Sequence, residues 1–162
     1  MNDVYDYHTD ILNVRKTSSG LQGGVLYPVY HSSVRLAAYL SMAFIFLVSL
    51  LTLRARNVSA VVLLVLLGWQ YSAPPLRLKE IPLLDSCSNG LIVFLAWLVG
   101  YTFGRGKLSN IPDKVFVLSL CTTGVHALGA AVDLESDVAA GQTTIATFLG
   151  QRSSAAFGAT TL

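Results

Sequence analysis

The chain has 162 residues, of which 53% are hydrophobic and only 12% are charged, and its formal net charge is +2. Soluble domains carry about 25% charged residues, so this composition excludes an ordinary water-facing surface and indicates an integral membrane protein. The small net charge argues against a nucleic-acid partner.

The first predicted element is an acidic segment at the start of the chain. Asp3, Asp6 and Asp10 follow Asn2 directly. Their i, i+3, i+7 spacing places them on one face of a helix, where like charges repel each other. We therefore expect a positive group to compensate them. Arg15 and Lys16 follow this cluster and are candidates to contact the same ligand, or alternatively lipid headgroups.

Four apolar stretches approach the length of about 20 residues that a membrane-spanning helix needs. We expect a fifth helix in the tail, which reads as the start of another crossing. Ala73, Pro74 and Pro75 end the second stretch, because proline cannot donate its amide and disfavours helix before it. The sequence thus predicts an all-α, polytopic transmembrane helical bundle with crossings at Val34–Leu53, Val58–Ser72, Asn89–Gly104 and Val115–Val132, and a tail helix at Thr144–Leu162.

The order of the crossings predicts that the acidic residues gather on one side of the membrane. Four crossings return the chain to the side on which it starts, so the acids after the fourth crossing lie beside the acids at the N-terminus. Basic residues divide between the two sides and give no clear orientation. Eight of the nine acidic residues fall on the starting side, namely Asp3, Asp6, Asp10, Glu80, Asp85, Asp133, Glu135 and Asp137.

Two acidic clusters on one side, with a basic loop between them, point to metal-assisted chemistry. Asp133 and Asp137 share a helix face at i, i+4 spacing. Carboxylates suit Mg²⁺, which prefers carboxylates, water and substrate phosphates. Tyr71, Arg77 and Lys79 of the loop "YSAPPLRLK" can neutralise or hydrogen-bond a diphosphate.

Each feature also has a plainer explanation. A single aspartate at a helix end is most simply a solvated acid that favours the helix dipole. Tyrosine, lysine and arginine are ordinary anchors at a membrane interface, and for the loop alone the two interpretations are balanced. Because two acidic clusters share one side, we favour the functional interpretation for the set.

Together these motifs resemble the UbiA-type intramembrane prenyltransferase superfamily. The N-D-x-x-D-x-x-x-D segment at Asn2–Asp10, the loop "YSAPPLRLK" and the D-x-x-x-D segment at Asp133–Asp137 occur in the expected order. The loop spacing resembles the variant found in the chlorophyll-synthase-like branch. The segment after the first motif lacks the Asn-Arg-Pro pattern of several branches, so the acceptor stays open.

The resemblance implies a bundle of about nine transmembrane helices, of which this chain holds about half. We therefore expect residues 1–162 to be a single membrane-embedded domain that is truncated at both ends. The implied activity is transfer of a prenyl group from prenyl diphosphate to a lipophilic acceptor. The implied Mg²⁺ ligands are Asn2, Asp3, Asp6, Asp10, Asp133 and Asp137, the implied substrate contacts are Asn2, Arg15, Lys16, Tyr71, Arg77 and Lys79, and the catalytic candidates are Asp6, Asp137 and Lys79.

Two alternatives remain open on the sequence. A transporter or channel fragment would bind transported cations, but its acids are expected near the bilayer midplane, whereas here they lie at helix ends. A non-catalytic truncated product is the other alternative.

Overall fold

The computed structural model describes residues 1–17 and 24–162, with side chains for all of these except Val14 and Arg15. Within these ranges the chain forms helices and no strand, which confirms the all-helical class. The elements are α1 (Asn2–Asp10), α2 (Val14–Thr17), η1 (Pro28–Tyr30), α3 (His31–Leu51), α4 (Ala55–Ser72), η2 (Leu78–Glu80), α5 (Leu84–Phe103), η3 (Leu108–Asn110), α6 (Asp113–Val132), α7 (Leu134–Ala139), α8 (Ile145–Leu149) and α9 (Gln151–Thr160).

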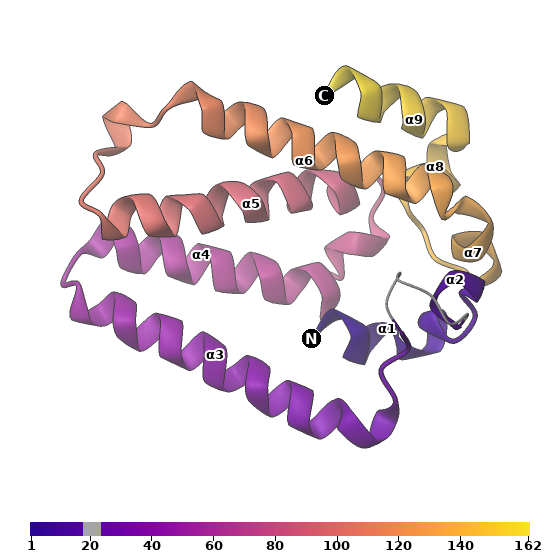
Figure 1. Cartoon of the computed structure of the whole chain (residues 1–162), viewed down its shortest axis with the longest axis horizontal. Helices are drawn as coiled ribbons and strands as arrows, with labels where there is room; N and C mark the ends of the chain where they lie inside the picture. Colours follow the sequence, from indigo (N-terminus) through magenta and orange to yellow (C-terminus); the bar gives the residue numbers. More distant parts are fainter. Residues whose placement is uncertain (18–23) are drawn as a thin grey trace.

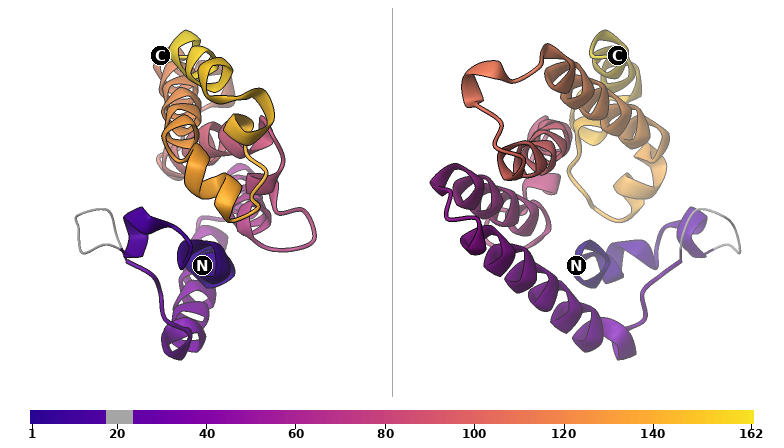
Figure 2. Two further views of the ribbon diagram at one scale, coloured as in Figure 1. Left: turned by 90° about the vertical axis from the view of Figure 1, so that its right-hand side faces the viewer. Right: turned by 60° about the vertical axis from the view of Figure 1, so that its left-hand side comes forward.

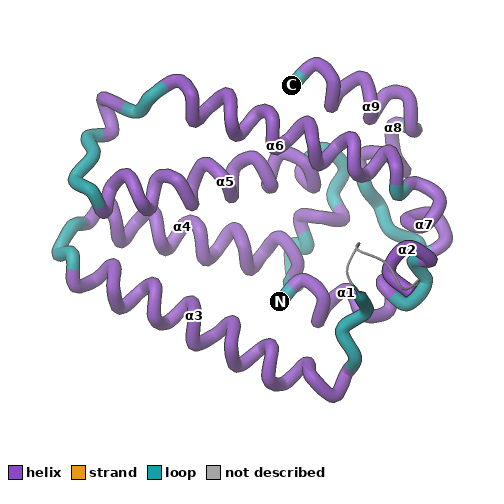
Figure 3. The backbone as a smooth tube through the Cα atoms, viewed as in Figure 1, coloured by secondary structure: helices purple, strands orange, loops and turns teal. Residues whose placement is uncertain are grey.

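Four long helices, α3 to α6, lie side by side along the longest axis of the molecule (Figure 1). α5 packs against both α4 and α6, α6 packs against α9, and α3 packs against α4. The turned views place α1 between α3 and the C-terminal elements (Figure 2). The α3–α4 and α5–α6 connections lie at one end of the bundle, and α1, α2, α7 and α8 lie at the other (Figure 3).

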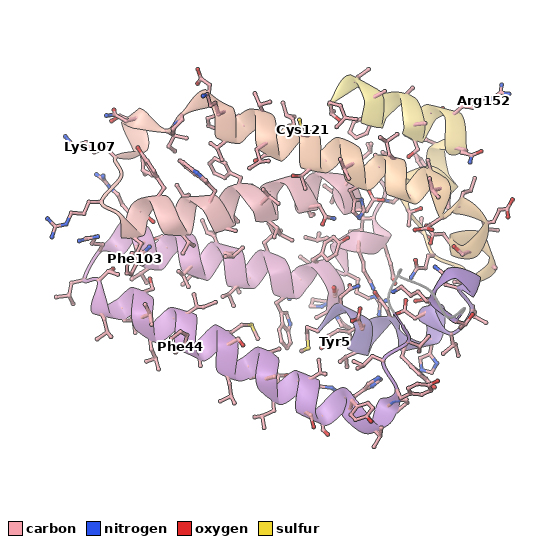
Figure 4. All side chains as sticks on the ribbon, in the orientation of Figure 1. Tyr5, Phe44, Phe103, Lys107, Cys121 and Arg152 are labelled. Carbon is pink, nitrogen blue, oxygen red and sulfur yellow. The ribbon has the colours of Figure 1, made fainter. Side chains whose placement is uncertain are left out.

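In this bundle many large apolar side chains are exposed and several polar side chains are buried, the reverse of the pattern in a water-soluble protein. Of the 21 residues of α3 only Ser49 is buried, and Phe44 on the outside of the same helix is 67% exposed (Figure 4). Most of the largest fully buried side chains are polar, among them Asn57, Asp85 and Ser154. Helices in lipid gain nothing by burying leucine and associate through small and polar residues instead, so this distribution suits a bilayer.

Three helical stretches of the described chain are long and apolar enough to cross a membrane: Pro28–Leu51, Leu84–Phe103 and Asp113–Val132. The remaining predicted crossing, the second at Val58–Ser72, forms the helix α4. It is less apolar than the other three because Arg56, Asn57 and Gln70 lie within it.

A buried polar cluster joins α3, α4 and α5 at the end of the bundle away from α1. The Asn57 side-chain oxygen accepts a hydrogen bond from Ser49 Oγ at 2.7 Å. Its Nδ2 donates to the Val99 carbonyl at 2.9 Å and to Thr102 Oγ1 at 3.1 Å. One amide thereby fixes the relative positions of three helices.

The helix boundaries differ from the sequence prediction in two informative places. α5 begins at Leu84 rather than Asn89, because Asp85 and Ser86 continue the helix while their side chains are buried. The prediction of one continuous tail helix over Thr144–Leu162 is wrong. Gly150 has a φ of +83° and separates α8 from α9, and α9 then packs along α6.

Glycines let the central helices approach closely. A Cβ at Gly90 of α5 would collide with the Thr123 hydroxyl and lie 2.5 Å from the Ser119 carbonyl oxygen, both on α6. A Cβ at Gly68, in the middle of α4, would meet nothing within 4 Å. The α5–α6 contact thus depends on the missing side chain, whereas Gly68 has no such constraint.

We expect Gly90→Ala to lower the free energy of unfolding by about 1–3 kcal/mol, because an overpacked helix contact forces the backbone apart. Gly68→Ala is the matched control and should be neutral or raise stability by up to about 1 kcal/mol, since alanine favours helix. Thermal unfolding in detergent micelles measures both. Equal melting temperatures for the two variants would contradict the close α5–α6 contact.

Candidate active site

The first wall of the site is α1, which presents two buried carboxylates. Asp6 and Asp10 are only 5% and 6% exposed, and both point to the same side of the short helix. Asn2 accepts a hydrogen bond from Ser72 Oγ at 2.5 Å, which ties the start of α1 to the end of α4. Asp3 is exposed and is absent from the cavity lining. Of the three aspartates predicted to share one face of this helix, only Asp6 and Asp10 therefore face the cavity.

Two lysines compensate these carboxylates. Lys79, on the η2 turn after α4, forms an ion pair with Asp6. Lys16, on α2, donates to Asp10 Oδ1 at 2.7 Å. The other oxygen of Asp10 is buried and has no hydrogen-bond partner among the described residues, so it is available to a ligand.

The second wall consists of Asp133, which lies between α6 and α7, and of Asp137 on α7. Thr144 Oγ1 donates to Asp137 Oδ2 at 3.2 Å, and the Gln142 amide donates to the Asp137 carbonyl at 2.8 Å. The loop that follows α7 therefore folds back and holds Asp137 in place.

Both walls line one cavity of about 300 Å³. The structure thus brings together the two acidic clusters that the order of crossings predicts on one side. The lining residues come from α1, α2, α4, η2, α6, α7 and the loop before α8: Asn2, Asp6, Asp10, Asn13, Lys16, Tyr71, Lys79, His126, Gly129, Ala130, Asp133, Asp137, Gln142 and Thr144.

Charge in the cavity is unbalanced. Four carboxylates face two ammonium groups, so the lining is negative when all six groups are ionised. Burial lowers the pKa of Lys79 to about 8, although Glu80 and Asp3 act in the opposite direction. Burial raises the pKa of Asp137 to about 6, with smaller opposing and reinforcing effects from Thr144 and Asp133.

The donor set fits a divalent cation of the magnesium type. Its groups are carboxylate and amide oxygens, with no thiolate, among the described lining residues. No three acidic, histidine or cysteine side chains of the described chain converge on a single preassembled metal position. Mg²⁺ is usually held by one or two carboxylates together with water and substrate phosphates. Carboxylates on two separate walls fit this coordination preference.

Beneath the carboxylates the cavity wall carries a hydrogen-bonded group that includes Tyr71 and His126. The Tyr71 hydroxyl lies 3.1 Å from His126 Nε2 and accepts from Asn89 Nδ2 at 2.9 Å. Ser86 Oγ lies 3.1 Å from His126 Nδ1. The predicted diphosphate contact Tyr71 therefore reaches the cavity, with its hydroxyl engaged by histidine and asparagine.

Asp85 is a structural member of the site that sequence reasoning did not single out. It is fully buried at the start of α5. Its carboxylate accepts from the Ile145 amide at 2.7 Å and from the Ser86 amide at 2.6 Å. It thereby fastens the loop that carries Thr144 to the helix that follows Lys79. The available signal was an acid shortly before an apolar stretch, where an unpaired charge is costly.

Two predicted substrate contacts are not placed in the cavity. Arg77 forms an ion pair with Glu80 and does not line it. The Arg15 side chain lies outside the described residues. The sequence also did not identify Asn13, Gln142 and Thr144, which are uncharged and lie in or beside turns.

The structure is thus an apolar helical bundle with two carboxylate walls and two lysines around a cavity at one end. The chain belongs to the UbiA prenyltransferase family, which matches it over residues 1–162.

Its curated relatives are enzymes of carotenoid metabolism. A lycopene elongase/hydratase of Haloarcula japonica is 33% identical over 93% of this chain and 49% of its own length. A lycopene elongase/hydratase of Corynebacterium glutamicum is 34% identical over 94% of this chain and 53% of its own length. The C(50) β-cyclic carotenoid biosynthesis protein LbtBC of Dietzia is 30% identical over 97% of this chain and 36% of its own length.

The fold is also that of solved structures. A UbiA homologue from Archaeoglobus fulgidus bound to DMAPP and Mg²⁺ superposes with a TM-score of 0.75 at 20% identity, over 99% of this chain and 57% of that one. The GPP and Mg²⁺ complex gives a TM-score of 0.71 at 23% identity, over 99% of this chain and 56% of that one. The chain thus spans about half the length of the proteins it matches.

We expect Asp137→Asn to raise the melting temperature of the metal-free protein above pH 6. The raised pKa means that the folded state holds its proton more tightly than the unfolded state, so ionisation of Asp137 destabilises the fold. This penalty is absent near pH 4 and complete above about pH 6. Melting curves of both proteins at pH 4 and pH 8 without divalent metal measure the effect. A stabilisation of equal size at both pH values would show that it does not come from the charge of Asp137.

Proposed function

We propose that this chain transfers a prenyl group from a prenyl diphosphate to a lipophilic acceptor within the membrane, in a Mg²⁺-dependent reaction. The observation that carries the proposal is the meeting of two carboxylate walls and two lysines in one cavity at one end of an apolar bundle. Family membership over the whole chain supports it. Because the chain spans about half the length of its relatives, the proposal concerns the complete protein.

In this proposal the aspartates bind metal and the lysines stabilise the leaving diphosphate. Asp6 and Asp10 on one wall, and Asp133 and Asp137 on the other, would hold magnesium ions. Bound magnesium neutralises diphosphate charge. Lys16 and Lys79 add positive charge where the leaving group develops its negative charge, and such interactions are strong in a site that excludes water. Asn2, held by Ser72, adds an amide to the first wall.

The identities proposed for the prenyl donor and the prenyl acceptor rest on the similar proteins. The solved homologues bind DMAPP and GPP, so we propose a short allylic diphosphate as donor. The curated relatives are named lycopene elongase/hydratase, so we propose a linear carotenoid as acceptor. An acceptor of this kind would dissolve in the bilayer and reach the cavity from lipid.

We also propose that residues 1–162 form one multi-pass unit in the membrane. α3, α5 and α6 have the length and apolarity to cross, and α4 lies beside α3 and α5 with comparable length. The cavity then lies at one membrane surface, where a water-soluble diphosphate can enter.

The test is prenyl transfer by the protein expressed from its own gene in isolated membranes, with radiolabelled dimethylallyl diphosphate, Mg²⁺ and lycopene. We expect labelled, extended carotenoid from the unmodified protein. Asp6→Asn should lower turnover at least 100-fold, because it removes a buried carboxylate from the first wall.

Asp113→Asn is the matched control, since Asp113 is exposed at the start of α6, at the other end of the bundle. It should keep turnover within twofold. Full turnover in Asp6→Asn would overturn the proposed site. Absence of labelled product from the unmodified protein, despite Mg²⁺-dependent binding of the diphosphate, would show a binding protein and overturn the proposed reaction.

A further inference from the structure

A tyrosine–histidine pair in the cavity wall is hydrogen-bonded on both sides. Asn89 Nδ2 donates to the Tyr71 hydroxyl oxygen, and that oxygen lies 3.1 Å from His126 Nε2. His126 Nδ1 lies 3.1 Å from Ser86 Oγ. The two rings meet edge to face, with centroids 6.5 Å apart. In the tautomer that carries its ring proton on Nδ1, the Tyr71 hydroxyl donates to Nε2, and Nε2 is the basic atom.

The pair lies deeper in the bundle than the carboxylates. His126 lies on α6 seven residues before Asp133, the residue that caps the end of this helix, and this separation is about 10 Å along the axis. Gly129 and Ala130 line the cavity between them. A Cβ at Gly129 would meet nothing within 4 Å. The cavity wall between the carboxylates and the pair therefore carries two small residues, Gly129 and Ala130.

We infer that Tyr71 and His126 form the proton acceptor that ends the reaction, which makes them catalytic residues rather than ligands of the diphosphate. This inference rests on the proposed function. It concerns the removal of a proton after the new carbon–carbon bond has formed. The carboxylates of the two walls lie beside the leaving diphosphate, so a base for this step has to come from elsewhere in the cavity.

The step balances as follows. The allylic C–O bond breaks and its electron pair leaves with the diphosphate. The π electrons of an acceptor double bond then form the new C–C bond, which leaves a cation on the adjacent acceptor carbon. A neighbouring C–H bond gives its electrons to that cation to make a new double bond, or a water molecule adds to it. In both cases one proton is released.

Tyr71 takes up this proton at its oxygen while its own proton passes to His126 Nε2. Such a relay requires groups within hydrogen-bond reach, which the 3.1 Å contact provides. The resulting imidazolium needs a nearby negative charge, because an unpaired charge is costly in a membrane interior. The buried carboxylate of Asp85, which accepts from the Ser86 amide, lies beside this group and provides that charge.

The test compares Tyr71→Phe and His126→Gln with the unmodified protein in the membrane assay with dimethylallyl diphosphate and lycopene. Products are separated by liquid chromatography, and the positions of double bonds and hydroxyl groups are assigned by NMR. Tyr101→Phe is the matched control, because its hydroxyl donates to the Lys107 and Asn110 carbonyls at the far end of the bundle.

We expect the native end product to fall at least tenfold as a share of total product in both variants. Isomeric alkenes should replace it, because the cation then loses its proton to other acceptors. The KM for dimethylallyl diphosphate should stay within twofold, and Tyr101→Phe should leave both quantities unchanged.

Two results would overturn the inference. Unchanged product identity with a KM raised at least tenfold would mean that the pair binds the diphosphate. Unchanged product identity with unchanged KM would mean that it has no part in the reaction. Absence of any extended product from the unmodified protein would instead refute the proposed function, and the inference with it. Tyr71→Phe removes a single oxygen, so it keeps the test decisive even where His126→Gln fails to fold.

Discussion

The ion pair between Asp6 and Lys79 joins the first acidic helix to the rest of the bundle. A charge in the interior of a helical bundle costs several kcal/mol unless an opposite charge accompanies it. Among the described residues, α1 is also attached to the end of α4 by the Asn2–Ser72 hydrogen bond. The lysines thus do two things: they make burial of the carboxylates tolerable, and they place positive charge in the cavity beside those carboxylates. The negative excess on the lining is what a divalent cation would correct.

The fold was largely predictable because its signals are strong and local. Long apolar runs between prolines and charged residues gave all four long helices. Their even number correctly placed Asp133 and Asp137 at the end where Asp6 and Asp10 lie. The errors came from tertiary context. Asp85 and Ser86 extend α5 because partners elsewhere satisfy them, and Gly150 divides the tail because its positive φ is a backbone property that no periodicity reveals.

The site was predictable where charge alone identifies a residue, and much less so elsewhere. Asp6, Asp10, Asp133, Asp137 and both cavity lysines follow from motif spacing. Asp3 shares that spacing yet is exposed, because helix α1 turns only one narrow face inward. Thr144 and Gln142 reach the cavity only through a folded-back loop, and the partners of His126, Tyr71 and Ser86, come from two other helices. Such contacts depend on packing between distant segments, which one sequence does not encode in any short pattern.

The hydrogen bond from the Ile145 amide to the Asp85 carboxylate fixes one end of each of two loops. One runs from Lys79 to Asp85 and the other from Asp137 to Ile145. Surface loops normally accept added residues with little loss of stability. In these two loops an inserted residue would change the position of Lys79 or of Asp137 in the cavity. Loop length in these two segments is therefore part of the geometry of the site.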